Sequence, residues 1–341
     1  MEQRSYNGVQ ARRRQEARRA ELRDAIVAYA HGPLVKRLQA PGPPVAIRAP
    51  AHGVRSIVHI LDFDGFPRVV LRVHGRWLRA ARLAHNFRSL ASMGLPVPAL
   101  LDSDLSPLTR WRWGFYALSE QFVEGRHPHE AADREAAVRA VARALASFHN
   151  VERRSWGWPA FPRLGSYRRH TLDRIAQRTG HLARVLPQAQ RDGLTAWFQQ
   201  HAGAASLGPP FALTHSRVNC GNFVVRPDGE ATALDLIECR YGSFCPDLVS
   251  ALHRFCDRDG HLMAALLDEY FAARPARCRE AFARSRTFFE ANRELGQAAS
   301  NTRRVGRAAD ADEASAFRAA VAQHVARLAE LTGVKLELLW P

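Results

Sequence analysis

Apolar and polar residues alternate in the first third of the chain, as they do in a half-buried β-sheet. In the segment RSIVHILDF (55–63), a two-residue period places Ile57, His59, Leu61 and Phe63 on one face and Val58 and Ile60 on the other. This is the period of a β-strand. Asp64–Gly65 follows as a turn, and RVVLRV (68–73) continues as a second strand. We therefore predict an antiparallel hairpin in this part of the chain.

Helical spacing replaces this alternation later in the chain. The segment WLRAARLAHNFRSLASMG (77–94) has apolar residues near a period of 3.6, and WGFYALSEQFVEG (113–125) is predicted as a further strand. From about residue 130 the period is helical, first in REAAVRAVARALASFHN (134–150). Further helices are predicted at 166–186, 188–203, 246–258, 260–273, 276–300 and 310–332, and a short β block interrupts them at 211–237.

This order of elements predicts an α+β protein with two lobes. A basic helical extension (1–44) precedes a small β-rich N-lobe (45–125). A large helical C-lobe (126–341) follows and contains the β hairpin region 211–237. No internal repeat or low-complexity segment competes with this division.

The amino-terminal extension contains a helix at about 10–39 that is rich in arginine and alanine and is ended by HGPL and APGPP. Its apolar face is thin, so we expect it to dock on the main domain. A basic amphipathic helix on a membrane surface is the alternative.

The formal net charge is +16, and Lys36 and Lys335 are the only lysines, so arginine supplies nearly all of the positive charge. A GC-rich genome that encodes arginine in place of lysine would explain this bias. An acidic partner would explain it too: a nucleotide, a phospholipid, an anionic glycolipid or nucleic acid. The two explanations are compatible, and no segment gives a specific nucleic-acid signal.

No apolar run is long enough to span a bilayer, and the basic amino terminus lacks an apolar signal core. We expect a cytoplasmic protein, with the inner face of the membrane as a second location. The five cysteines form no CxxC pair and no zinc-ligand spacing. Their odd number predicts free thiols, and buried packing is favoured over oxidation-sensitive chemistry.

The late β block places two oxygen-bearing side chains together. FALTH should be a buried strand ending at His215, and FVVRPDGEATALDLI (223–237) should be a hairpin with a turn at Pro227–Gly229. A hairpin folds Asn222 and Asp235 back toward each other. An amide oxygen and a carboxylate are ligands suited to Mg²⁺, although turn and capping residues of these types also flank hairpins.

The same stretch carries a motif in which Asn222 follows His215 by seven residues, and LDLIE follows with Asp235 and Glu238. It resembles the catalytic core of the aminoglycoside phosphotransferase and choline kinase-like branch of the protein-kinase fold, which has HGDxxxxN and then an acidic metal motif. PDLVSAL, with Asp247, resembles the family's next helix. Upstream, RVVLRV, MGLPVPALL, YALSEQFVEGR and VARALASFHN resemble further family segments, so the resemblance covers roughly residues 45–300.

The resemblance implies a protein-kinase-like two-lobed fold, with ATP and Mg²⁺ as cofactors. It places Arg72 at the nucleotide-pairing position and His215 in the catalytic loop. It implies that Asn222 and Asp235 contact the metal nucleotide, and that Glu238 is a further metal ligand.

Three positions depart from the family pattern. Arg217 stands where the family has its catalytic aspartate, and a guanidinium cannot accept a proton at physiological pH. Arg72 replaces a lysine, and RAARLAHNF (79–87) offers no acidic partner for it. The glycine-rich cover over the phosphates is reduced to Gly53.

These departures leave two functional hypotheses. The chain is a pseudokinase or atypical nucleotide-binding protein, or it is an active atypical phosphotransferase acting on a small-molecule or lipopolysaccharide-type sugar hydroxyl. The expected partners are a nucleotide with an anionic small-molecule or glycolipid acceptor, or a protein, and the basic amino-terminal helix adds peripheral membrane contact. SYRRHTLDRIAQR (166–178) could line a cleft between the lobes for an acidic substrate, or form a solvated helix face.

Overall fold

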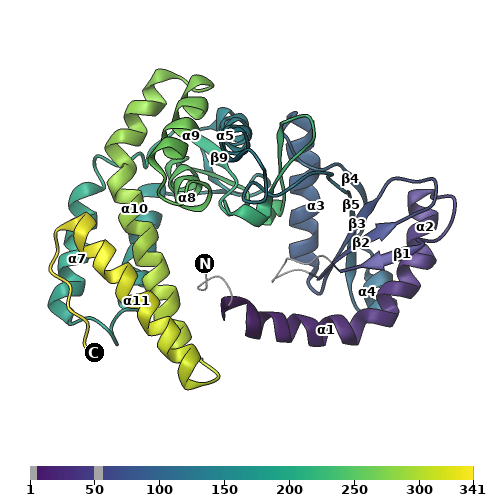
Figure 1. Cartoon of the computed structure of the whole chain (residues 1–341), viewed down its shortest axis with the longest axis horizontal. Helices are drawn as coiled ribbons and strands as arrows, with labels where there is room; N and C mark the ends of the chain where they lie inside the picture. Colours follow the sequence, from purple (N-terminus) through teal and green to yellow (C-terminus); the bar gives the residue numbers. More distant parts are fainter. Residues whose placement is uncertain (1–5, 50–56, 341) are drawn as a thin grey trace. The chain divides into compact units, whose positions relative to one another are not determined.

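The computed structural model describes residues 6–49 and 57–340 (Figure 1). Its residues form two compact units: Met1–Ser147 with Asn219–Cys239, and Phe148–Val218 with Arg240–Pro341. Gly53, on which the reduced glycine-rich cover was predicted, lies outside the described residues. The predicted boundaries of the extension and the two lobes stay a prediction.

The first unit is built on a five-stranded antiparallel sheet with the order β1-β2-β3-β5-β4. Its strands are β1 (Ala46–Arg48), β2 (Ile57–Asp62), β3 (Val69–His74), β4 (Leu100–Asp104) and β5 (Tyr116–Gln121). The predicted hairpin corresponds to β2 and β3. The strands β1 and β4 were not predicted, because three to five residues without clear alternation give little periodic signal.

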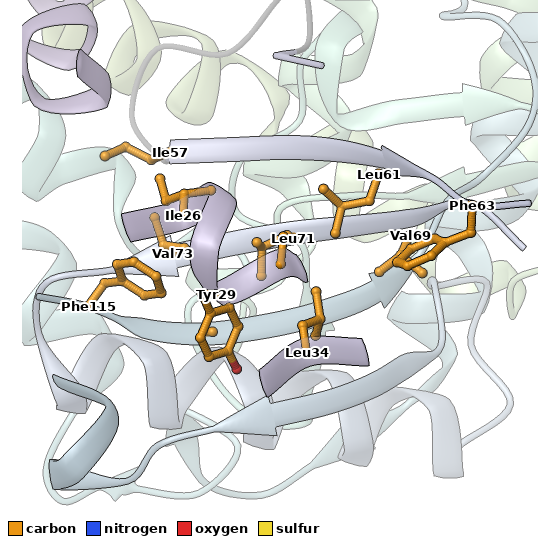
Figure 2. Packing of buried hydrophobic residues seen from close by; sticks show 12 residues of the cluster. Ile26, Tyr29, Leu34, Ile57, Leu61, Phe63, Val69, Leu71, Val73 and Phe115 are labelled. Atoms are coloured by element: carbon orange, nitrogen blue, oxygen red, sulfur yellow. The ribbon is translucent and has the colours of Figure 1, made fainter. Parts of the chain in front are cut away.

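In the described part of this unit, five helices accompany the sheet: α1 (Tyr6–His31), α2 (Pro33–Leu38), α3 (Trp77–Ser92), α4 (Pro107–Trp113) and α5 (Arg134–Asn150). The last turn of α5 groups with the second unit. α1 and α2 contribute Ile26, Tyr29 and Leu34 to a buried core with Leu61 and Leu71 of the sheet (Figure 2). The end of the arginine-rich helix is therefore docked on the main domain.

Polar contacts fix this helical extension to the sheet as well. The Tyr29 hydroxyl donates to Asp104 at the end of β4 over 3.1 Å, and the Arg37 guanidinium contacts Asp102 at 2.6 and 2.8 Å. Burial, followed by the charge of Asp104, raises the pKa of Tyr29, so its hydroxyl remains a donor.

A two-stranded hairpin, β10 (Phe223–Val225) with β11 (Ala231–Ala233), also belongs to the first unit. Gly125, just after β5, has a φ of 146°, and a side chain there would collide with the Val225 carbonyl and the Val224 side chain. This glycine lets the chain after β5 approach the hairpin closely enough for Arg126 to bridge to Val225.

The second unit combines a small antiparallel sheet with a set of helices. The sheet has the order β6-β9-β12-β7-β8, with β6 (Glu152–Arg153), β7 (Trp156–Gly157), β8 (Pro162–Arg163), β9 (Phe211–Thr214) and β12 (Arg240–Gly242). The helices are α6 (Tyr167–Gly180), α7 (Gln188–His201), α8 (Cys245–Phe255), α9 (Gly260–Ala272), α10 (Ala276–Val305) and α11 (Ala311–Thr332). The long helices α10 and α11 pack side by side (Figure 1).

Within the described residues, all five cysteines are buried and none forms a disulfide: Cys220, Cys239, Cys245, Cys256 and Cys278. Burial raises the pKa of Cys245 to about 12, which suppresses the reactive thiolate. Within residues 6–49 and 57–340, no helix is both long and apolar enough to cross a membrane.

Candidate functional site

A buried ion pair occupies one face of the first unit's sheet. The Arg72 guanidinium on β3 lies 2.6 Å from the Glu120 carboxylate on β5, and only 9% and 4% of the two residues is exposed. The strand register pairs Arg72 with Leu118 and Val70 with Glu120, so Arg72 and Glu120 are diagonal neighbours on the same face. Side chains alternate along β3, so this face is opposite to the one that Leu71 presents to α1 and α2.

The sequence does not reveal Glu120 as the partner of Arg72, because the family resemblance places that acidic partner on the helix that follows β3. That helix, α3, contains no acidic residue, and the partner comes instead from the neighbouring strand. The signal was present in the alternation of YALSEQ, but it depended on knowing the register between β3 and β5.

A third charge, Asp235, acts on this ion pair. Burial acts to lower the pKa of Arg72, but the charges of Glu120 and then Asp235 outweigh burial and raise it. Burial raises the pKa of Glu120, and Arg72 opposes that rise. His74, two residues along β3, has its pKa lowered to about 3 by burial and then by Arg72 and Arg79. The site therefore holds a permanent cation, two carboxylates and a neutral imidazole.

The hairpin brings Asn222 and Asp235 to its open end. The register pairs Phe223 with Ala233, and the Leu234 amide donates to the Asn222 carbonyl over 2.8 Å. The second strand stops at Ala233, earlier than predicted, because Asp235 has left-handed dihedral angles (φ 56°, ψ 56°) and a 3₁₀ turn, η3 (Leu236–Glu238), begins there. Aspartate tolerates this conformation better than most residues.

The turn after Asp235 is held in place by α3. The Asn86 side-chain amide donates to the Leu236 carbonyl over 2.8 Å, and Arg82 lies 3.9 Å from the Glu238 carboxylate. Asn86 is fully buried, so this bond fixes the backbone immediately after Asp235. Glu238 is partly exposed, and it forms an ion pair with Arg82.

The donor set suits magnesium in its chemistry. Asn222 precedes the first strand of the hairpin and Asp235 follows the second, so an amide oxygen and a carboxylate flank the same end of the hairpin. Mg²⁺ prefers hard oxygen ligands of this kind. Across residues 6–49 and 57–340, no group of three or more His, Cys, Asp or Glu side chains could hold a metal by itself. A magnesium ion here would take its remaining ligands from nucleotide phosphates and water.

His215 and Arg217 belong to the second unit. The Asp247 carboxylate accepts the backbone amides of His215 and Ser216 at 2.7 and 3.0 Å, and His149 lies 3.4 Å from the same carboxylate. The His215 Nδ1 atom accepts the Arg217 backbone amide at 3.3 Å. These contacts fix the backbone of the loop that carries Arg217.

Hydrogen bonding keeps Asp247 charged although it is buried. Burial acts to raise the pKa of Asp247, but His149, His215 and the Ser216 amide together lower it below its ordinary value. Burial lowers the pKa of His149, whose Nδ1 contacts the Tyr270 hydroxyl at 2.8 Å. A neutral His149 that accepts from Tyr270 and donates to Asp247 satisfies this geometry.

The antiparallel sheet with its buried Arg72–Glu120 pair and the acidic hairpin define an α+β protein of the protein-kinase-like fold, as the sequence predicted. Solved structures of this fold confirm that class. The model of the phosphotransferase enzyme family matches residues 47–281, and the chain belongs to that family. A search of curated proteins found no match.

The solved structures show the fold at low sequence identity. A structure described as a putative aminoglycoside phosphotransferase from Ralstonia eutropha JMP134 has a TM-score of 0.65 and 17% identity, over 92% of this chain and 98% of that one. A choline/ethanolamine kinase family protein from Mesorhizobium loti has a TM-score of 0.63 and 17% identity, over 91% and 94%. A macrolide 2′-phosphotransferase from Brachybacterium faecium has a TM-score of 0.57 and 19% identity, over 87% and 98%.

Proposed function

We propose that the first unit binds ATP with Mg²⁺. Arg72 would pair with the phosphates, and Asn222 and Asp235, with Glu238 as a further ligand, would hold the metal. The observation that carries the proposal is the buried Arg72, which is held by Glu120 and lies in the field of Asp235. Solved relatives support the nucleotide: a thermostable aminoglycoside phosphotransferase mutant was crystallised with ADP and hygromycin B, and another with AMP-PNP and hygromycin B.

We infer further that ordinary base-assisted phosphoryl transfer is absent, so that the chain is a pseudokinase or atypical nucleotide-binding protein. Arg217 stands at the family's catalytic aspartate position, and its guanidinium has no site that can accept the proton of an attacking hydroxyl. Removing a general base typically costs about 10²–10⁴-fold in rate.

The second candidate is an active phosphotransferase that uses a small-molecule or lipopolysaccharide-type sugar hydroxyl. It would move the γ-phosphoryl group of ATP to that hydroxyl, giving ADP and a phosphate ester, with the hydroxyl proton released to water. The loop held by Asp247 favours it, because the backbone amides of His215, Ser216 and Arg217 are all hydrogen-bonded. Positioning and electrostatics carry most phosphoryl transfer, so a missing base need not abolish it.

Arg217→Asp and Arg217→Ala separate the two candidates. We expect wild-type ADP formation, measured with a panel of sugar acceptors, to stay at the level of a protein-free control and to remain there in both variants. Acceptor-dependent turnover by the wild-type protein would contradict the first candidate and support the second.

A further inference from the structure

The second unit contains a pocket of about 420 Å³ with an unusual concentration of arginine. Arg163, Arg174, Arg178 and Arg240 all line it. Its other lining includes the aromatic side chains of Trp156, Trp158 and His170, and it reaches Ser216, the residue before Arg217. The pocket therefore combines cations and flat ring surfaces beside the loop that carries Arg217.

Helix α6 supplies one wall of this pocket by its spacing. His170, Arg174 and Arg178 are four residues apart, which places them on one face of the helix. Ser166 is the N-cap of α6: its side chain accepts the Arg169 amide, and this cap fixes where the helix face starts. These residues belong to SYRRHTLDRIAQR, for which an acidic substrate was one of the two interpretations.

Three of the pocket arginines donate hydrogen bonds to uncharged side chains. Arg178 donates to the Asn292 side-chain oxygen over 2.6 Å, and Arg174 donates to Gln177 over 3.0 Å. Arg240 donates to the Ser216 hydroxyl over 3.1 Å.

Arg163 contacts an aromatic ring, with its guanidinium 5.3 Å from the centre of the Trp156 ring. Over the described residues, none of the four pocket arginines forms an ion pair with a carboxylate. Asp247 also lines the pocket, but its two oxygens accept the His215 and Ser216 amides.

The arginines act on one another as like charges. Burial lowers the pKa of Arg178 to about 10, and Arg174, Arg240 and Arg303 lower it in the same direction. Burial, followed by the charges of Arg163, Arg174 and Arg240, also lowers the pKa of His170. The charge of Asp173 acts in the opposite direction but does not cancel this effect. Such a gathering of cations is unfavourable in itself, and an anion bound between them would relieve the repulsion.

We propose that this pocket binds the phosphate monoester group of a small hydroxyl-bearing molecule, with Arg174, Arg178 and Arg240 as its ligands. Guanidinium groups bind phosphate oxygens through paired hydrogen bonds, and a dianion suits several arginines that form no ion pair with a carboxylate. Trp158 lines the pocket and is partly exposed, so its ring offers a surface on which a sugar ring can pack. That the bound molecule is the acceptor rests on the proposed phosphotransferase function; the anion site itself does not.

The test is calorimetric titration of the nucleotide-free protein with glucose 6-phosphate, inorganic phosphate and, as a neutral match, glucose. We expect both anions to bind and glucose to bind at least tenfold more weakly. We expect Arg178→Gln and Arg174→Gln each to weaken glucose 6-phosphate binding about tenfold or more. Arg169→Gln is the matched control, because Arg169 is exposed on the same helix and does not line the pocket, and it should bind like the wild type.

Two further arms identify the source of the phosphate and separate this site from the nucleotide site. Vesicles of phosphatidylcholine with phosphatidic acid present the same monoester on a lipid, so Arg178-dependent binding to vesicles alone would assign the pocket to a lipid headgroup. Asp235→Asn should leave anion binding unchanged, since Asp235 belongs to the first unit. The proposal is overturned if no anion binds, or if folded Arg178→Gln and Arg174→Gln, checked by thermal melting, bind like the wild type.

Discussion

Arg72 and Glu120 form a buried ion pair, so the loss of one partner should leave the other as an uncompensated charge inside the protein. We expect Glu120→Gln to lower the free energy of unfolding by about 3 kcal/mol, the usual scale for breaking a buried pair. Urea unfolding measures it. The double variant Arg72→Met/Glu120→Leu should cost less than Glu120→Gln, because it removes both charges. A cost below about 1 kcal/mol for Glu120→Gln would show that the pair is not desolvated.

His74 should make the first unit sensitive to acid. Its folded pKa is about 3, below the value of about 6.5 in an unfolded chain, so only the unfolded chain takes up this proton between those values. Its effect on stability is therefore absent above pH 7 and becomes destabilising as the pH falls below 6.5. At pH 5 the loss should be about 2 kcal/mol.

Unfolding in urea at pH 7.5 and pH 5.0 checks this prediction. His74→Gln cannot titrate and should lose less stability between the two pH values than the wild type does. His253 in the second unit has its pKa lowered to about 4, chiefly by burial, so it also makes stability depend on pH. It is present in both proteins and therefore does not account for the difference between them. An equal pH dependence in both proteins would mean that His74 accepts its proton in the folded state.

At the scale of elements, α1 offers a matched pair of neighbouring residues. Ile26 is fully buried in the core of Figure 2, whereas Val27 is 37% exposed. We expect Ile26→Ala to lower the free energy of unfolding by about 2–4 kcal/mol, through lost burial and the cavity left behind. Val27→Ala should cost well under half of that. Equal costs, measured by urea unfolding, would contradict the docking of α1 on the sheet.

Elements with a sustained period were predictable from the sequence. The helix predicted at 134–150 coincides with α5, and the alternation in 55–63 corresponds to β2. The strands of two or three residues in the second unit were missed, since a period cannot be recognised in so few positions. The predicted second strand of the hairpin extends past Ala233, where the observed strand ends. The left-handed conformation of Asp235 ends it there, and this conformation depends on how α3 holds the following turn.

At the scale of the whole molecule, sequence reasoning found the family but only part of the site. The spacing from His215 to Asn222 and the LDLIE segment identified the family that the model of residues 47–281 confirms. The partner of Arg72 could not be found, because contacts between strands are set by register. The sequence indicates two of the pocket arginines, Arg174 and Arg178, by their four-residue spacing on α6. Arg240 comes from β12 and is brought to the pocket by the fold of the sheet.

Metal-dependent nucleotide binding by the first unit is the central claim, and one calorimetric titration tests it most directly. ATP is titrated into the wild type and into Asp235→Asn, each with Mg²⁺ and with EDTA. Asparagine tolerates the left-handed conformation of Asp235, so this variant removes the charge and leaves the turn intact. We predict that the wild type binds ATP more tightly with Mg²⁺, and that Asp235→Asn loses this metal-dependent gain. A wild-type protein that binds no ATP, or a gain that survives in Asp235→Asn, would contradict the claim.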